Sequence, residues 1–441
     1  MAMPGDLEVG RSALAKASWR LLPLIGLGYG VAYMDRVNIS FAALQMNHDL
    51  GFSAAVYGLG GGLFFLSYAL LEVPSNLMLV RFGARRWIAR IMLTWGVIAM
   101  GMLFVRTPLQ FYVMRFALGA AEAGFFPGVV FYLTHWFPAD ERGRAVSRFY
   151  VALPLSSVVM GGLAGTLLGL GGHLGLAGWQ WLFLAEGLPA VLVGLAVLAF
   201  LPDSPESSAW LSSAEKAWIA ARLAADRDAA GAAGDPGVGR ALLDPRVWLL
   251  GISNFCIMAA VYAFALSTPT ILKDATGLSV AGVGYLVAGA SLVAAAAMVV
   301  AGWHSDLRRE RHLHVAGFLV MLAAAFFALG TTTSPWIVAG AYAVTAIVGA
   351  ALQAVFWLIP SDALLGRSAA VGVAAVGSIG MIGAVVGPYA WGLARDLTGS
   401  YQAGLSSLTV PYLVAAGLLL LLRHRARAAG GGGLAQTAAA G

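Results

Sequence analysis

Apolar stretches long enough to cross a membrane recur along almost the whole chain. About 20 apolar residues span the hydrocarbon core of a bilayer. Charged residues make up 11% of the 441 positions, whereas a soluble domain carries about a quarter, so the composition argues against a soluble fold. We predict an all-α polytopic membrane protein with twelve membrane-spanning helices, at residues 19–45, 53–80, 87–105, 108–136, 143–170, 179–201, 245–272, 279–302, 312–332, 335–359, 368–394 and 404–422.

The predicted spans fall into two sets of six, because residues 202–244 form the one long polar stretch among them. Similar basic turns, at residues 81–86 and 302–309, follow the second and the eighth span and indicate a duplicated six-helix unit. Ser212 and Glu215 have the spacing of a capping box, which predicts a short amphipathic helix in the linker. The predicted parts are an N-terminal cytoplasmic segment (1–18), an N-terminal six-helix bundle (19–201), a cytoplasmic linker (202–244), a C-terminal six-helix bundle (245–422) and a disordered cytoplasmic tail (423–441).

Basic residues gather in the connections on one side of the predicted membrane. The other side has only Arg106, Lys273 and Arg395 between spans. The positive-inside rule then makes both termini cytoplasmic. The first residues contain no apolar core of a cleavable signal peptide, and the excess of arginine over lysine is typical of a GC-rich bacterial genome. We therefore expect a multi-pass protein of a bacterial inner (plasma) membrane. The single cysteine, Cys256, excludes an intramolecular disulfide.

Ionisable residues also lie inside the predicted spans, in the first third of the chain. A charge at the bilayer centre costs roughly 2.5–3.5 kcal/mol on translocon scales, so such residues point to function. Three carboxylates and two guanidiniums leave one negative charge in excess. A bound proton would cancel it, and a bound anion would require a further proton. This balance indicates a proton-coupled anion carrier. The residues are Asp35, Arg36, Glu72, Arg115 and Glu122.

These residue types suggest distinct roles. The planar guanidinium of Arg36 suits a carboxylate, so Arg36 is the candidate anion clamp. Asp35 and Glu122 are candidate proton sites, because burial and nearby arginines shift carboxyl titration in opposite directions. Arg115 lies two helical turns from Glu122 on the same face and would hold one carboxylate charged until the proton arrives. The alternative is a static ion-pair network that holds the helices together.

Several motifs, taken in order, resemble the anion:cation symporter family, a branch of the major facilitator superfamily with permeases for tartrate, galactonate, phthalate and hydroxyphenylacetate. The chain looks most similar to the tartrate-type permeases. The motifs are Tyr33-Met34-Asp35-Arg36-Val37-Asn38, Glu72-Val73-Pro74-Ser75-Asn76, Arg115-Phe116 with Gly119, Glu122-Ala123-Gly124, Phe126-Pro127-Gly128, Arg142-Gly143-Arg144-Ala145 and Trp179-Gln180-Trp181-Leu182-Phe183.

The resemblance implies the major facilitator fold and proton-driven uptake of a small organic anion by alternating access. It assigns proton binding to the positions of Asp35 and Glu122, and the substrate carboxylate to that of Arg36. Arg115 would pair with the proton site. Two further positions would line the substrate cavity, namely Tyr33 and Tyr68.

Two positions depart from the family pattern. Glu72 stands where galactonate-type members have glutamine, and could act in the site or pair with the region of Arg81. Met381 stands where members often have asparagine, which disfavours a polyhydroxy sugar acid and favours a less hydroxylated or aromatic acid.

The second half would supply shape and hydrogen bonds rather than charge. Gln353 and Trp357 are four residues apart on one face of the tenth span, and Ser361 follows a turn later. Tyr262 in the seventh span could join them.

The basic turns after the second and eighth spans predict a latch on the cytoplasmic side, formed by Arg81, Arg85, Asp306 and Arg308. In the first turn Val80 replaces the usual acid, so the latch would be asymmetric.

Other functions fit less well. Proton-driven drug efflux is the main alternative, but the fifth span lacks the Gly-Pro pair usual in efflux proteins, and Arg36 would repel cationic drugs. A membrane sensor would leave the buried charges without a purpose. We predict no enzyme activity and no cofactor, since no nucleophile–base pair or nucleotide-binding loop is apparent. We also predict no metal site, since His304, His312 and His314 are expected in a solvated loop. Expected partners are a small organic anion, protons and the lipid bilayer, without nucleic acid, and we expect a monomer.

Overall fold

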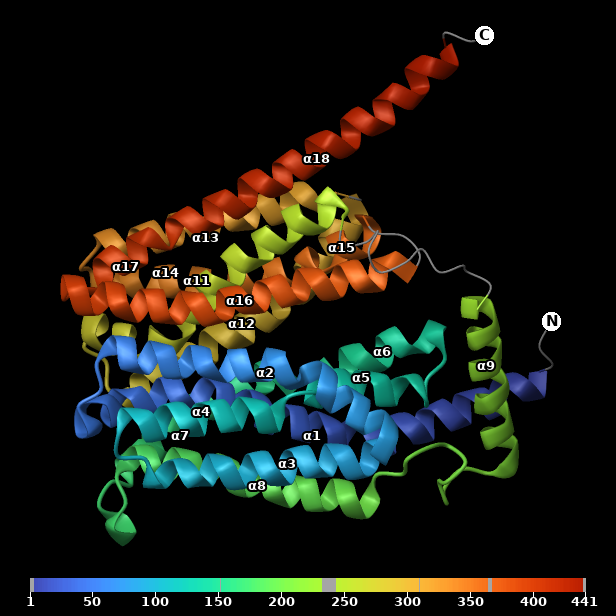
Figure 1. Ribbon diagram of the computed structural model, residues 1–441, viewed down its shortest axis with the longest axis horizontal. Coiled ribbons are helices and arrows are strands. Elements are labelled where there is room, and N and C mark those ends of the chain that lie inside the picture. Colours follow the sequence, from blue (N-terminus) through green and yellow to red (C-terminus); the bar gives the residue numbers. More distant parts are fainter. Residues whose placement is uncertain (1–3, 151, 232–242, 309, 364–366, 439–441) are drawn as a thin grey trace. The chain divides into compact units, whose positions relative to one another are not determined.

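The computed structural model describes residues 4–150, 152–231, 243–308, 310–363 and 367–438, which fold almost entirely into helices (Figure 1). In the first half the helices are α1 (Pro4–Leu50), α2 (Ala54–Phe82), α3 (Ala84–Gly101), the 3-10 turn η1 (Met102–Phe104), α4 (Pro108–Glu122), α5 (Phe125–Thr134), α6 (Ala139–Tyr150), α7 (Ala152–Gly169), η2 (His173–Gly175), α8 (Gly178–Phe200) and α9 (Ser213–Gly231). In the second half they are α11 (Pro245–Thr276), α12 (Val280–Arg308), α13 (His312–Thr331), α14 (Pro335–Phe356), α15 (Leu358–Ala363), α16 (Arg367–Thr398), α17 (Tyr401–Ser407) and α18 (Thr409–Ala438).

The helices confirm the predicted all-α membrane architecture. Within the described ranges, 11 helical segments are long and apolar enough to cross a membrane, from Ala54–Phe82 to Tyr401–Arg425. They coincide with the second to twelfth predicted spans. The first predicted span lies within α1, which is 47 residues long and carries Asp35 and Arg36 in its apolar part. The helix begins at Pro4, so most of the predicted N-terminal segment (1–18) belongs to the same helix as the first span.

Three predicted spans are built from two α-helices each, the fourth from α4 and α5, the tenth from α14 and α15, and the twelfth from α17 and α18. The break in the fourth is the clearest, because Gly124 has a left-handed backbone with φ of 84°. A side chain would be strained at this φ, and the Ser75 side chain leaves no room for a Cβ there. The break directly follows Glu122 and ends α4 at that residue.

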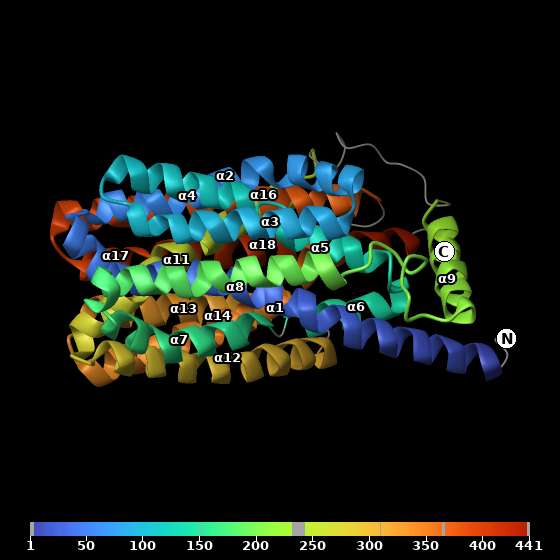
Figure 2. The ribbon, with the colours of Figure 1, turned by 90° about the horizontal axis from the view of Figure 1, so that it is seen from below.

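The chain divides into two compact units. The first comprises Met1–Phe52 and Leu63–Gly234, and the second comprises Ser53–Gly62 and Asp235–Gly441. In the first unit α8 packs along α3 and α1, and α1 also packs against α7 (Figure 2). Gly96 of α3 and Gly187 of α8 bring the two backbones into contact, because a Cβ on Gly96 would lie 2.7 Å from the Gly187 carbonyl oxygen.

In the second unit α11 packs along α16 by the same device. Gly383 and Gly387 of α16 lie directly on the α11 backbone at Phe255 and Ala259. The buried Asn254 amide donates a hydrogen bond to the Val376 carbonyl oxygen at 3.1 Å and fixes the register of the pair.

The linker contains α9, which begins with the expected capping box. The Glu215 carboxylate accepts a hydrogen bond from the Ser212 backbone N–H at 2.8 Å, and the Ser212 hydroxyl accepts one from the Glu215 N–H at 3.3 Å. At the C-terminus of the chain, α18 extends to Ala438 and includes most of the segment that was expected to be a disordered tail. The expectation rested on four consecutive glycines, whereas the flanking alanines favour helix.

Candidate functional site

Four of the five ionisable residues singled out in the sequence meet inside the first unit. Asp35 and Arg36 come from the second half of α1, and Arg115 and Glu122 come from α4. Asp35, Arg115 and Glu122 are each at most 2% exposed, whereas the Arg36 side chain is 18% exposed. Of these four, Arg36 is therefore the one that an incoming molecule could reach.

Arg36 and Glu122 form a salt bridge across the two helices. The Arg36 Nε and Nη2 atoms donate hydrogen bonds to Glu122 Oε1 at 3.0 and 2.5 Å. The second oxygen, Glu122 Oε2, is buried and has no hydrogen-bond partner among the described residues. Glu122 Oε1 thus accepts both hydrogen bonds, whereas Glu122 Oε2 could accept a further one in this buried site.

Aromatic rings from α2 hold the two guanidiniums. The Arg36 Cζ atom lies 5.1 Å from the Tyr68 ring centre and 5.8 Å from that of Phe64. The Arg115 Cζ atom lies 4.7 Å from the Phe64 ring centre. Cation–π attraction is strongest where water is excluded, so the buried Phe64 ring positions both arginines.

Arg115 interacts by charge with Asp35 and with Glu122. The Trp95 indole of α3 lies next to the Asp35 carboxyl, but neither Asp35 oxygen makes a hydrogen bond of normal geometry within the described ranges. The two-turn spacing in α4 predicted that Arg115 and Glu122 share one face, and both are indeed buried in the same cluster. A buried carboxyl without hydrogen bonds is costly when charged.

One member of this cluster, Glu186, is not among the site residues predicted from the sequence. Glu186 of α8 is 1% exposed, and its Oε2 atom accepts a hydrogen bond from the Asn38 amide of α1. Its carboxyl also interacts by charge with Asp35 and Arg115. The signal was available, because Glu186 is an acidic residue inside the predicted span 179–201.

The other residues predicted in the first unit, Tyr33, Tyr68 and Glu72, differ in burial. Tyr68 of α2 is buried, and Tyr33 of α1 is half-buried. Glu72, one helical turn beyond Tyr68, is also half-buried and lies within electrostatic reach of Arg36. Arg81, the expected alternative partner of Glu72, instead stacks on the Phe82 ring at 5.6 Å.

Three of the site residues predicted in the second unit are half-buried. Gln353 of α14 and Trp357 at its C-cap are half-buried, as is Tyr262 of α11. The side chains of Ser361 and Asp306 lie outside the described residues. The contribution of this unit to a binding site stays a prediction.

The predicted latch residues of the first unit have local partners. The Arg85 Nε atom donates a hydrogen bond to the Leu198 carbonyl oxygen at 2.6 Å, and the Arg85 backbone N–H donates to Asp203 at 3.0 Å. Asp203, in the segment just after α8, therefore supplies an acid at this turn, where Val80 replaces the usual one. Arg308 of the second unit is exposed, and the latch itself stays a prediction.

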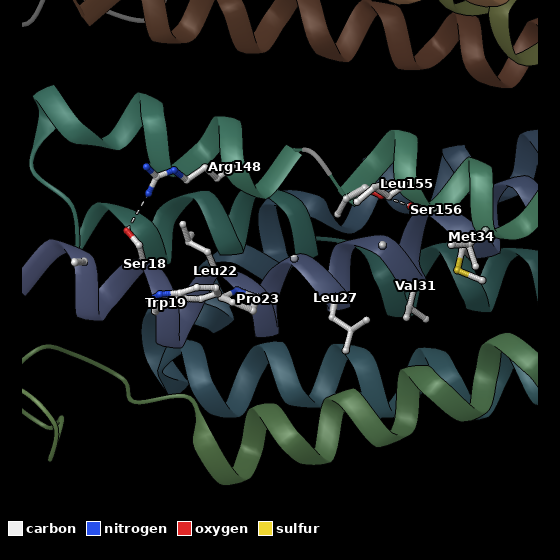
Figure 3. A pocket seen from close by; sticks show the side chains of 15 residues that line it. Ser18, Trp19, Leu22, Pro23, Leu27, Val31, Met34, Arg148, Leu155 and Ser156 are labelled. Atoms are coloured by element: carbon white, nitrogen blue, oxygen red, sulfur yellow. Dashed lines mark hydrogen bonds between the residues drawn. The ribbon is translucent and has the colours of Figure 1, made fainter. Parts of the chain in front are cut away.

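A separate groove of about 770 Å³ runs between α1 and the helices α6 and α7 (Figure 3). Leu27, Val31 and Leu155 give it an apolar wall. Among the described residues that line it, Arg148 is the one ionisable residue, and it donates a hydrogen bond to the Ser18 hydroxyl at 3.5 Å. The groove therefore lacks the carboxyls of the charged cluster. No group of three or more metal-binding side chains occurs within the described part of the chain.

The chain is similar to known membrane transporters over nearly its whole length. The Major Facilitator Superfamily model matches residues 25–388 and 250–435. A protein of Agrobacterium vitis named as a candidate tartrate transporter is 44% identical over 419 residues, covering 95% of this chain and 94% of the relative. A quinolone resistance transporter of Acinetobacter baumannii is 39% identical over 414 residues, covering 94% of this chain and 95% of the relative.

A solved structure shares the fold. It is a crystal structure of a bacterial homologue of the human lysosomal transporter Spinster, in an inward-facing and occupied conformation. The TM-score is 0.76 and the identity 17%, with 92% of this chain and 96% of that chain covered.

Proposed function

The chain belongs to the Major Facilitator Superfamily of membrane transporters, and on that premise we propose that it imports a small organic anion together with protons. The observation that carries the proposal is the salt bridge between Arg36 and Glu122, in which the guanidinium is partly exposed and the carboxylate is sealed. A substrate carboxylate can approach such a guanidinium, whereas the matching acid can be neutralised only by a proton.

Substrate and proton would act on the same arginine. Both N–H groups that Arg36 gives to Glu122 Oε1 are the kind that bind a substrate carboxylate in a bidentate manner. When Glu122 takes up a proton, its hold on Arg36 weakens, and the guanidinium becomes available to the substrate. Anion binding and protonation of Glu122 therefore favour each other, which is the coupling that a symporter needs.

The other residues complete the proposal. Arg115 would keep the remaining buried carboxyl charge balanced, and Asp35 would be the second proton site. Tyr33 and Tyr68 would line the path to Arg36. The relative named for tartrate supports a dicarboxylate or a similar small acid as substrate. We further propose a bacterial inner-membrane location with both termini in the cytoplasm, and a monomer.

Drug efflux is a second candidate function, because one relative is named as a quinolone resistance transporter. The two candidates differ in the direction of proton-driven flux. Import predicts that an inward proton gradient drives the accumulation of an anion. Efflux predicts that the same gradient drives the extrusion of a drug.

A binding screen separates these candidates first. Purified protein is melted with tartrate, an aldonate, phthalate, hydroxyphenylacetate or a quinolone, at mildly acidic and mildly alkaline pH. An organic acid that raises the melting temperature, more strongly at acidic pH, supports proton-linked anion binding. Stabilisation by the quinolone alone would support the efflux function.

The roles of the pair are tested in proteoliposomes with the acid found in the screen. Arg36→Ala should abolish binding, and retained affinity would contradict the clamp. Glu122→Gln mimics the protonated acid, so exchange should persist while gradient-driven accumulation is lost. Glu141→Gln, which removes an acid paired with Arg144 on α6, is the matched control and should accumulate substrate normally. Accumulation by Glu122→Gln would refute the coupling role of Glu122.

A further inference from the structure

Glu186 is a buried acid that the mechanism above does not use. It lies in the middle of α8, and its carboxyl is anchored on one side only, by the Asn38 amide. The other oxygen, Oε1, is buried and has no hydrogen-bond partner in the described part of the chain. An ionised carboxylate normally fills this capacity with donors, so the site is incomplete for a charged Glu186.

Asp35 has the same deficiency in the same place. Its two carboxyl oxygens are buried and lack hydrogen bonds of normal geometry among the described residues, and it interacts by charge with Glu186. Asn38 lies three residues after Asp35, about one turn of α1, and so presents its amide on the same side. Two acids from α1 and α8 thus meet in a sealed part of the bundle.

The surrounding helices supply too little positive charge for both acids. The α3 residue next to Asp35 is the neutral Trp95. The arginines of α3 lie in its first two turns, away from Trp95. Neither α7 nor η1 contains an ionisable residue. From α4 come Arg115 and another acid, Glu122, and from α1 comes Arg36, which is bonded to Glu122. Arg115 is therefore the main cation for Asp35 and Glu186 together.

Two neighbouring carboxylates in a dry site repel each other, and desolvation disfavours each charge further. One guanidinium can balance one of them. We propose that Asp35 and Glu186 form a carboxyl pair that binds one proton between them, as a proton-binding site separate from Glu122. Asn38 is the positioning residue that holds Glu186 against Asp35.

This inference rests on the proposed function for its role in transport, but not for the existence of the pair. Arg115 interacts by charge with Asp35, Glu122 and Glu186. When the pair binds a proton, Arg115 would therefore interact mainly with Glu122. When the pair loses that proton, Arg115 would again interact with the pair. The pair and the Arg36–Glu122 salt bridge are linked through this one guanidinium.

Infrared pH-difference spectroscopy of the purified full-length protein tests the pair without any substrate. Wild-type protein should show a protonated carboxyl band near neutral pH that exchanges slowly with deuterium oxide, because the pair is buried. Glu186→Gln should remove this band, or shift its pH midpoint toward acid by about one unit or more, a tenfold change in proton affinity. Glu141→Gln should leave the band unchanged.

A second variant covers the case in which Glu186→Gln fails to fold. Asp35→Asn removes the other member and should remove or shift the same band. A band that is unchanged in a folded variant of either acid would overturn the pair. If the band behaves as expected but no organic acid is transported, the pair stands and the proposed function fails. In transport, Glu186→Gln should shift the pH optimum of tartrate uptake toward acid, whereas a purely structural role would lower uptake equally at every pH.

Discussion

Glu215→Gln should loosen the attachment of α9 to the N-terminal part of α1. In the wild-type protein the Glu215 carboxylate accepts hydrogen bonds from the Ser12 hydroxyl at 2.6 Å and from Lys16 Nζ at 3.0 Å. The Trp218 side chain packs against Gly10 beside them. Burial by itself would raise the pKa of Glu215, but the bonds from Lys16, Ser12 and the Ser212 N–H outweigh it and lower the pKa to about 2.

The magnitude follows from that shift. The ordinary pKa is 4.5, and each pKa unit corresponds to about 1.4 kcal/mol, so the shift sets an upper limit of about 3.5 kcal/mol. The Lys16 side chain is 44% exposed, so water screens its share, and we expect about 1–2 kcal/mol. The pKa is depressed in the folded state, so this contribution is fully present above pH 4.5 and is lost as the pH falls toward 2.

Hydrogen–deuterium exchange of α9 in the purified protein measures this effect. At neutral pH, Glu215→Gln should reduce amide protection in α9 about 5–30-fold, while the exposed Glu8→Gln on α1 should leave it unchanged. Wild-type protection, corrected for intrinsic rates, should approach that of the variant as the pH falls below 4.5. Equal protection in wild type and Glu215→Gln at neutral pH would refute the reasoning.

Two other substitutions test how the cluster is held. Gly124→Ala should destabilise the protein by about 1–3 kcal/mol, since Gly124 has φ of 84° and Ser75 fills the space of a Cβ. A melting curve should show this loss, and Gly143→Ala, which has open space on α6, should not show it. Phe64→Leu removes the ring shared by Arg36 and Arg115, each worth about 0.5–2 kcal/mol in cation–π attraction. It should weaken binding of the acid found in the screen several-fold by calorimetry, and unchanged affinity would show that the ring does not position Arg36.

The sequence indicated much of the candidate site because charges are rare in membrane spans. Asp35, Arg36, Arg115 and Glu122 stood out for that reason alone, and helical periodicity placed Arg115 and Glu122 on one face. Glu186 carries the same signal, because it is an acidic residue inside the predicted span 179–201. The partners of each charge could not be derived, since adjacent residues such as Asp35 and Arg36 face different helices.

The sequence alone determined the membrane fold and its helices, because continuous apolar runs of about 20 residues with few charges satisfy their backbone hydrogen bonds in a bilayer as helices. Tertiary structure decided which charges meet. It joined Arg36 to Glu122, placed the Phe64 ring next to two guanidiniums, and brought Glu186 within electrostatic reach of Asp35. It also broke the fourth span at Gly124, where close approach of Ser75 requires a glycine. Such pairings depend on helix packing and rotation, which local sequence patterns do not specify.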